Sequence, residues 1–206
     1  MKSLTELAEF YQTDKCYTLH NYIAMYEQWF GKLHINKMLE IGLGGGASVR
    51  MWADYFPDAE IYAMELGGEE FKNNWANSTL DVSDINIIIG NSTDPKIWEN
   101  IPDNLDLIID DGDHTADSQI ATFKLGFNKL RSRGTYSIED THCGFEERYG
   151  KSFALYNYFF NLVINQQLPG ANTEGDFYKF QQYMPEIVRD IYAYHFYKSI
   201  IFLEKA

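Results

Sequence analysis

The sequence predicts an α/β fold of the doubly wound class, in which helices cover both faces of a mainly parallel β-sheet. Short, continuously apolar runs recur through the middle of the chain, longer amphipathic stretches separate them, and the first run leads directly into a glycine-rich turn. Strands that are apolar along their whole length are typical of parallel sheets, because both faces of such a sheet are buried. Their alternation with helices indicates a doubly wound arrangement.

The individual elements follow from this pattern. We predict strands at Lys37–Ile41, Glu60–Met64, Ile85–Ile89, Leu105–Asp110 and Gly134–Ile138. Apolar residues at helical spacing predict helices at Ala47–Tyr55 and Thr115–Leu130. With no repeat and no Pro/Gly/Ser-rich linker, the chain is expected to form one domain over residues 1–206.

The two ends of the chain depart from this alternation. Ser152–Gln167 is expected to be a long helix, and two β-rich runs follow it at Asp190–His195 and Ser199–Glu204. About three residues separate these runs, which suits an antiparallel hairpin and is too short for a crossover. Residues 1–36, helical in pattern at Leu4–Tyr11 and Tyr22–Phe30, are expected to cap the carboxyl edge of a core formed by residues 37–206.

Composition and charge restrict the possible partners. The chain has 206 residues, of which 45% are hydrophobic and 23% charged, as expected for a folded protein with a substantial core. Its net charge of −13 would repel a polyanion, so a nucleic-acid partner is not expected. The same charge tolerates a cationic cofactor or a metal ion.

The sequence favours a cytoplasmic protein without a membrane partner. No apolar run reaches the roughly 20 residues that a transmembrane helix requires. The segment Met1–Glu6 lacks the apolar stretch of a signal peptide. Two cysteines, Cys16 and Cys143, are too few for a disulfide framework, and a reducing compartment is the default.

A glycine-rich turn, Gly42–Gly46, follows the first predicted strand and precedes a helix. Glycines allow the backbone to turn tightly and to approach a ligand at the helix N-terminus. Nicotinamide, flavin and S-adenosylmethionine sites all use such a turn, and a purely structural turn is also possible. The pattern G-x-G-x-G differs from the dinucleotide pattern G-x-G-x-x-G, in which a glycine would stand at Ala47.

Residues at the ends of the next two strands extend this candidate site. Glu65 ends the second strand, where a carboxylate can accept both ribose hydroxyls, although a nicotinamide cofactor would use it equally well. Asn91 and Ser92 follow the third strand and are candidates for reading an adenine edge; a helix N-cap is the structural alternative.

Acidic residues cluster where the fourth and fifth strands end. Asp110, Asp111 and Asp113 follow one strand, and Glu139 and Asp140 follow the other. If the two strands are neighbours, Asp111, Glu139 and Asp140 converge, and their mutual repulsion calls for a cation between them. A ligand set made only of oxygen atoms favours Mg²⁺, Mn²⁺ or Ca²⁺. The alternative is that these acidic residues lie separately in solvated loops and bind no metal.

Two histidines accompany these acids. His114 lies three residues beyond Asp111, within reach of a hydroxyl bound to the metal, and is the candidate general base. His142 is a possible ligand, although a supporting or helix-capping role is the preferred interpretation.

Several of these segments resemble the metal-dependent class I S-adenosylmethionine O-methyltransferases that act on sugar hydroxyls of macrolide antibiotics, the mycinamicin and tylosin type. The matching segments are Thr13-Asp14-Lys15 with His20 and Tyr22, Glu40–Gly46, Ile109–His114, Ile138–Asp140, Asn165–Leu168, His195–Lys198 and Phe202–Lys205. The resemblance implies a Rossmann-like, seven-stranded class I methyltransferase sheet. It also implies an enzyme that uses S-adenosyl-L-methionine and Mg²⁺ (or Mn²⁺) to methylate a hydroxyl of a sugar or glycosylated natural product, and that assembles as a homo-oligomer.

The resemblance also assigns roles to individual residues. Asp111, Glu139 and Asp140 are expected to bind the metal, and His114 to be the catalytic base. The residues expected to bind the methyl donor are Thr13, Glu40, Gly42, Gly44, Gly46, Ser48, Glu65, Asn91, Ser92 and Asp110.

Other readings remain open at this point. A catechol-type O-methyltransferase acting on a vicinal diol would share the fold and the metal, and an NAD(P)-dependent oxidoreductase would share the fold. A further hypothesis is not enzymatic: the chain could be a cofactor-binding domain that has lost its activity and is retained for its part in an assembly. Aromatic residues at Tyr149–Tyr158 and Phe177–Tyr183 are candidates for a sugar platform, a lid or an oligomer surface, and the sequence does not rank these.

Overall fold

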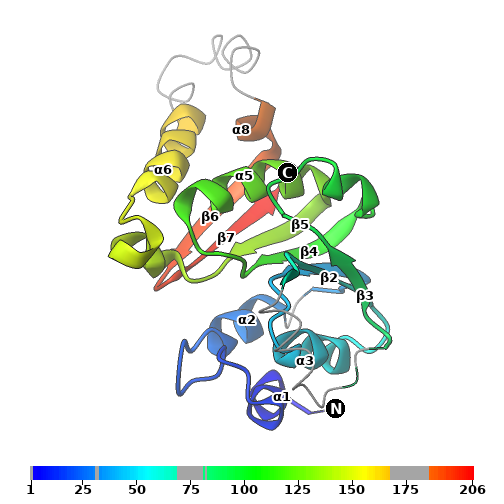
Figure 1. The fold of residues 1–206 in the computed structure, drawn as a ribbon. Helices are drawn as coiled ribbons and strands as arrows, with labels where there is room; N and C mark the ends of the chain where they lie inside the picture. The colour runs from blue at the N-terminus through cyan, green and yellow to red at the C-terminus, as the bar shows by residue number, and fades with distance from the viewer. Residues whose placement is uncertain (1, 31–32, 69–80, 82, 168–185) are drawn as a thin grey trace.

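A seven-stranded mixed β-sheet with helices on both faces forms the core of the structure (Figure 1), a computed structural model that describes residues 2–30, 33–68, 81, 83–167 and 186–206. The strand order is β3-β2-β1-β4-β5-β7-β6. The strands are β1 (Lys37–Ile41), β2 (Glu60–Glu65), β3 (Asn86–Ile89), β4 (Leu105–Asp110), β5 (Leu130–Ile138), β6 (Ile191–Tyr197) and β7 (Ile200–Lys205). The doubly wound α/β prediction is therefore confirmed.

The direction of the strands also agrees with the sequence. β1 pairs in parallel with β2 and β4, β2 with β3, and β4 with β5. β7 pairs antiparallel with both β5 and β6, so the predicted C-terminal hairpin is present. The two residues between β6 and β7 include Ser199, whose φ of 66° lies in the left-handed region that tight hairpin turns use.

Alternate residues of the central strands supply two separate cores. Leu107 and Ile109 of β4 face the helices α1 (Leu4–Tyr11), α2 (Ile23–Phe30) and α3 (Ala47–Tyr55). Ile108, between them, faces the helices α5 (Ala116–Gly126), α6 (Ala154–Gln167) and α8 (Glu186–Asp190). Figure 1 shows these two groups of helices on opposite sides of the sheet. Both faces are buried, which explains why the strands are apolar without interruption.

The helix predicted at Thr115–Leu130 is shorter than expected. Thr115 is its N-cap and accepts a hydrogen bond from the Ser118 amide, but α5 ends at Gly126 and a 3₁₀ turn continues to Lys129. Lys205 of β7 donates to the carbonyl oxygens of Phe127, Asn128 and Leu130 at 3.2, 3.3 and 2.8 Å. These contacts satisfy carbonyls that a helix end leaves unpaired. The strand β5 begins at Leu130, earlier than the predicted start at Gly134.

The N-terminal helices do not lie across the carboxyl edge of the sheet. α1 and α2 pack beside α3 on one face, where Tyr26 of α2 contacts the rings of Trp52 and Phe202. The connecting residues 12–22 reach the carboxyl edge instead, so the expected cap is formed by a loop. Both helices are short and apolar on the buried side, and burial against the sheet stabilises them more than an exposed position over its edge would.

Three remaining observations complete the description. No helix among the described residues is long and apolar enough to cross a membrane. Cys16 and Cys143 are both free. The aromatic segment Phe177–Tyr183, named above as a candidate platform, lies outside the described residues.

We expect Phe123→Ala to lower the free energy of unfolding by about 3–5 kcal/mol, because it leaves a cavity between α5, β5 and α6. The Phe123 ring is fully buried, with ring centroids 5.0 Å from Phe127, 5.3 Å from Tyr136 and 5.0 Å from Phe159. Chemical denaturation measures the change. The control, Phe10→Ala, removes a ring that is 64% exposed and should cost under about 1 kcal/mol. Equal losses for the two variants would contradict this account of the core.

Candidate active site

Three neighbouring strands deliver acidic residues to one edge of the sheet. Backbone hydrogen bonds continue the pairing beyond the strands: the Asp111 amide donates to the Ile41 carbonyl and the Glu139 amide to the Asp110 carbonyl, both at 2.9 Å. Asp111 is thereby held beside the glycine turn, and Glu139 and Asp140 beside Asp111. The carboxyl edge of a doubly wound sheet is where ligands bind in this class of fold.

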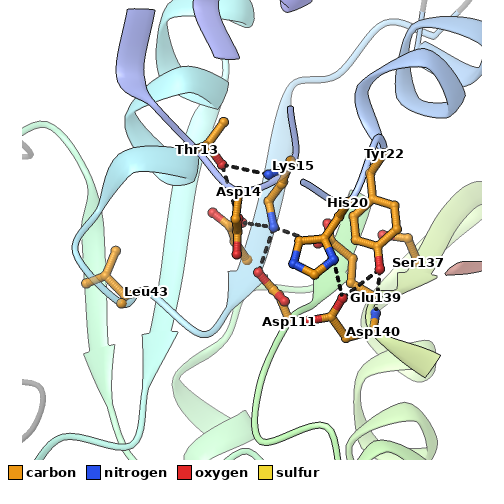
Figure 2. A network of polar contacts seen from close by, with 12 residues as sticks. Thr13, Asp14, Lys15, His20, Tyr22, Leu43, Asp111, Ser137, Glu139 and Asp140 are labelled. Atoms are coloured by element: carbon orange, nitrogen blue, oxygen red, sulfur yellow. Dashed lines mark hydrogen bonds and ion pairs between the residues drawn. The ribbon is translucent and has the colours of Figure 1, made fainter. Parts of the chain in front are cut away.

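A buried lysine lies inside this acidic cluster (Figure 2). The Nζ of Lys15 is 2.6 Å from Asp111 Oδ2, 2.7 Å from Glu139 Oε2 and 3.5 Å from Glu40 Oε1. Burial alone lowers the pKa of the Lys15 ammonium, but the negative charges of Asp111, Glu139 and Glu40 outweigh that effect and raise it well above its ordinary value. Lys15 is therefore charged.

Two tyrosines from the N-terminal segment bind the carboxylates that end β5. Tyr26 donates a short hydrogen bond to Glu139 Oε1, and Tyr22 donates to Asp140 Oδ1 at 2.6 Å. Glu139 thus has one oxygen on Lys15 and the other on Tyr26. Asp140 adopts a left-handed backbone with φ of 54°, and its side chain is 12% exposed.

Histidines surround Asp140. His114 Nε2 lies 3.6 Å from Asp140 Oδ2, and His20 Nδ1 lies 3.5 Å from Asp140 Oδ1. His142 is more distant, with Nδ1 3.9 Å from Asp140 Oδ1 and Nε2 3.9 Å from Glu146 Oε1. His114 has a φ of 60°, and in the described part of the chain its buried Nδ1 has no hydrogen-bond partner.

The donor set suits a hard divalent cation. Ligand atoms of Asp111, His114 and Asp140 all lie within 4.8 Å of one another. Glu139 lies behind them, with both oxygens already bound. Carboxylate oxygens with a single imidazole are compatible with Mg²⁺ and Mn²⁺. Of the residues predicted as ligands, Asp111 and Asp140 therefore lie close together with His114, whereas Glu139 is not part of this group. A second group, His142, Cys143 and Glu146, has the same spread, but its Glu146 also pairs with Arg148.

A cavity of about 670 Å³ opens beside this cluster. It is lined by the glycine turn, by the ends of β2 and β3, and by Asp111 and His114. Of the residues predicted to bind a donor, those that line it are Thr13, Gly42, Gly44, Ser48, Glu65, Asn91 and Ser92. Asp111 and His114 of the candidate metal centre therefore share one cavity with the candidate donor site, whereas Glu139 and Asp140 are not among its lining residues.

Glu65 is tied to the glycine turn from the opposite wall. Its Oε2 accepts hydrogen bonds from the amides of Leu43 at 2.9 Å and Gly44 at 3.2 Å. The carboxylate fixes the turn, and a contact of the same oxygens with ribose hydroxyls stays a prediction. Asn91 instead forms a turn, accepting from the amide and hydroxyl of Thr93 at 2.9 and 2.8 Å.

Glu40, Gly46 and Asp110 are not among the lining residues. Glu40 is fully buried against Lys15 and Trp52, and burial raises its pKa to about 7. Burial likewise raises the pKa of Asp110 to about 7, where the hydroxyl of Tyr136 donates to it at 3.2 Å. Gly46 bonds back to Leu43 within the turn. A direct donor contact from these three residues stays a prediction.

Sequence reasoning assigned no role to several residues that shape the site. Lys15 and Tyr22 appeared only as parts of the family resemblance, and Tyr26 did not appear as a site residue. Gln119 also belongs here, because its side-chain amide donates to the Glu139 carbonyl at 3.0 Å. Neither a lysine in a connecting loop nor a tyrosine in a helical pattern carries a signal that it will be buried against carboxylates, so periodicity could not have found these residues.

Comparison with curated proteins finds sugar O-methyltransferases. The chain is 27% identical to mycinamicin VI 2''-O-methyltransferase of Micromonospora griseorubida and 25% identical to demethylmacrocin O-methyltransferase of Streptomyces fradiae. Each alignment covers 98% of this chain, and 52% or 53% of the relative. The chain therefore spans about half the length of these relatives. No protein-family model matches it.

Comparison with solved structures also finds methyltransferases. The structure of MycE methyltransferase from the mycinamycin biosynthetic pathway, in complex with Mg, SAH and mycinamycin VI, superposes with a TM-score of 0.82 at 25% identity. That superposition covers 100% of this chain and 54% of the MycE chain. A putative caffeoyl-CoA O-methyltransferase from Staphylococcus aureus, with a TM-score of 0.57 and 18% identity over 93% of its chain, shares the fold. The predicted class I methyltransferase fold is confirmed.

We expect Gly42→Ala to destabilise the protein by more than about 3 kcal/mol, because the new Cβ would overlap the Asp111 backbone carbonyl. The φ of Gly42, 93°, adds strain. Gly44→Ala is the matched control: it also has a positive φ, 51°, but no atom lies within 4 Å of the new Cβ, so a loss of about 1–2 kcal/mol is expected. Denaturant unfolding measures both, and a Gly42→Ala variant as stable as Gly44→Ala would refute the close approach.

Proposed function

We propose that this chain is an S-adenosylmethionine-dependent and divalent-metal-dependent O-methyltransferase that acts on a hydroxyl of a sugar or of a glycosylated natural product. The carrying observation is that Asp111 and His114 line the same cavity as the glycine turn and Glu65. A methyl donor at the turn and an acceptor hydroxyl at the carboxylates would therefore be neighbours. The curated relatives, which are named for methylation of glycosylated compounds, supply the substrate class.

The donor half of the cavity fits a nucleoside with a positive charge. The glycine turn lets the backbone lie close to a ligand in the cavity at the N-terminus of α3, and Glu65 offers carboxylate oxygens for ribose hydroxyls. Asn91 and Ser92, at the end of β3, also line this half and are proposed to contact the adenine. The net charge of −13 adds a field that favours a cationic donor.

Asp111 and Asp140 are proposed to hold the divalent ion, with Glu139 as a further ligand. The ion supplies positive charge that lowers the pKa of an acceptor hydroxyl. Glu139 is already bound by Lys15 and Tyr26, so its side chain is fixed before any ligand arrives. That rigidity favours orientation of the reactants, which is the main source of acceleration when no covalent enzyme intermediate forms.

His114 is proposed to accept the proton of the acceptor hydroxyl at Nε2. This nitrogen lies 3.6 Å from Asp140 Oδ2. The side chain lines the cavity and is partly exposed, so an acceptor can reach it. His114 has a left-handed backbone, with a φ of 60°, and directly precedes Thr115, the N-cap of α5.

We infer a cytoplasmic location, because Cys16 and Cys143 are both free in the structure and a reducing compartment keeps them so. Association into a homo-oligomer stays a prediction. The partner that the comparisons support is a small glycosylated molecule.

The first test replaces the proposed base. His114→Ala should bind S-adenosylhomocysteine with nearly unchanged affinity in calorimetry, while its rate of methyl transfer falls roughly 100- to 10,000-fold, because a positioned base contributes that much. His34→Ala, which removes an exposed histidine, is the control and should keep full activity. Unchanged transfer by His114→Ala would remove His114 from the chemistry.

The second test removes the metal. After chelation with EDTA, formation of S-adenosylhomocysteine from S-adenosylmethionine and a glycosylated acceptor should cease, and Mg²⁺ or Mn²⁺ should restore it. Asp140→Asn should lose this restoration. Turnover that survives strict chelation would rule out the metal role. Faster turnover of a vicinal phenol than of any sugar would favour the catechol-type alternative, and binding of NAD in place of S-adenosylhomocysteine would favour an oxidoreductase.

A further inference from the structure

We propose that Lys15 is the resident counter-ion of the carboxylate cluster: it holds Asp111 and Glu139 in place when no divalent ion is bound, and an arriving ion takes over part of its electrostatic role. This inference rests on the metal site proposed above. It assigns a positioning role to Lys15, which does not line the cavity.

The contacts of Lys15 join three strands. Its ammonium group reaches Asp111 after β4 and Glu139 after β5 at hydrogen-bond distance, and Glu40 of β1 at 3.5 Å. The Lys15 side chain is 1% exposed, and that of Glu139 is 2% exposed. Charge-assisted hydrogen bonds in such a setting are strong, and each one fixes the rotamer of its carboxylate. Lys15 therefore sets where the oxygens of Asp111 and Glu139 lie.

The loop that carries Lys15 is itself held in place. The Lys15 carbonyl accepts hydrogen bonds from the amides of Tyr22 and Ile23 at 3.0 and 3.2 Å, at the start of α2. The Asp14 carbonyl accepts from the His20 amide at 3.1 Å. Figure 2 shows the Lys15 side chain extending from this segment toward Asp111 and Glu139. Because the backbone is anchored at α2, the ammonium cannot swing away from the carboxylates.

The formal charges of the cluster sum to a net negative charge that one divalent ion would offset. Asp111, Glu139 and Asp140 bring three negative charges and Lys15 brings one positive charge, so the net charge is −2. Within the described residues, Lys15 is the sole lysine or arginine that pairs with any of these carboxylates. One divalent ion would offset this formal charge of −2.

This arrangement predicts a link between Lys15 and the metal. Without an ion, removing Lys15 leaves Asp111 and Glu139 buried beside each other with no positive charge, which is strongly unfavourable. With an ion, the missing charge is partly supplied. A lysine that is only a packing residue would produce no such link, because its loss would cost the same in both conditions.

The experiment compares thermal unfolding of wild type and Lys15→Met, in EDTA and with excess Mn²⁺. In EDTA the variant should unfold at a temperature lower by roughly 5–15 °C, as expected for a broken buried ion pair in a chain of this size. Added Mn²⁺ should raise the Tm of the variant by more than it raises that of wild type. Calorimetric titration should show that Lys15→Met binds Mn²⁺ with an affinity at least as high as that of wild type.

Tyr26→Phe is the matched control, since it removes a neutral hydrogen bond to the same carboxylate, Glu139, without changing charge. Its loss in Tm should be equal in EDTA and in Mn²⁺. A metal-induced rise for Lys15→Met that is no larger than that of wild type would overturn the proposal.

Lys15→Gln, which keeps a hydrogen-bond donor but not the charge, provides a second variant. Folding of either Lys15 variant only when Mn²⁺ is present would support the proposal, and failure of both to fold even with Mn²⁺ would contradict it. If Mn²⁺ gives no rise in wild type, the metal site of the proposed function fails, which is a different result from a rise in wild type that the variants do not exceed.

Discussion

The convergence of carboxylates at one edge of a parallel sheet is the constraint on which the rest of the structure depends. β1, β4 and β5 are neighbours and point the same way, so Glu40, Asp111, Glu139 and Asp140 end side by side. Buried like charges at this spacing destabilise a fold unless positive charge or protons compensate. The structure compensates with Lys15, with hydroxyl donors, and with a raised pKa at Glu40. A divalent cation would supply further positive charge at this edge of the sheet.

The N-terminal segment belongs to this site as much as the sheet does. Its helices bury apolar side chains on the α3 face, and that packing carries Lys15, Tyr22 and Tyr26 to the ends of β4 and β5. Packing energy from the core thereby supports polar contacts that would be unfavourable by themselves. Stability and the proposed function depend on the same few residues, because the loop that carries Lys15 also lines the cavity through Thr13 and Asp14.

Much of the fold could be predicted from the sequence, since continuous apolar strands permit few arrangements. The residues that end strands, Asp111, Glu139 and Asp140, were predictable for the same reason: strand direction fixes the edge at which they emerge. The end of α5 could not be predicted, because it depends on hydrogen bonds from Lys205 of β7, a residue distant in the sequence. Exposure around α6 was also not predictable, since Phe153, which precedes the helix, and Phe160, which lies in it, are 54% and 50% exposed. Contacts between distant segments decided each of these cases, and local patterns do not contain them.

The most direct measurement is the anomalous scattering of Mn²⁺ in crystals grown with S-adenosylhomocysteine and a manganese salt. The account predicts one strong peak bounded by Asp111, Glu139 and Asp140, with the nucleoside on the glycine turn and Lys15 still bound to Asp111 and Glu139. A cavity that holds S-adenosylhomocysteine with no manganese at the carboxylates would contradict it. So would a peak confined to the group formed by His142, Cys143 and Glu146.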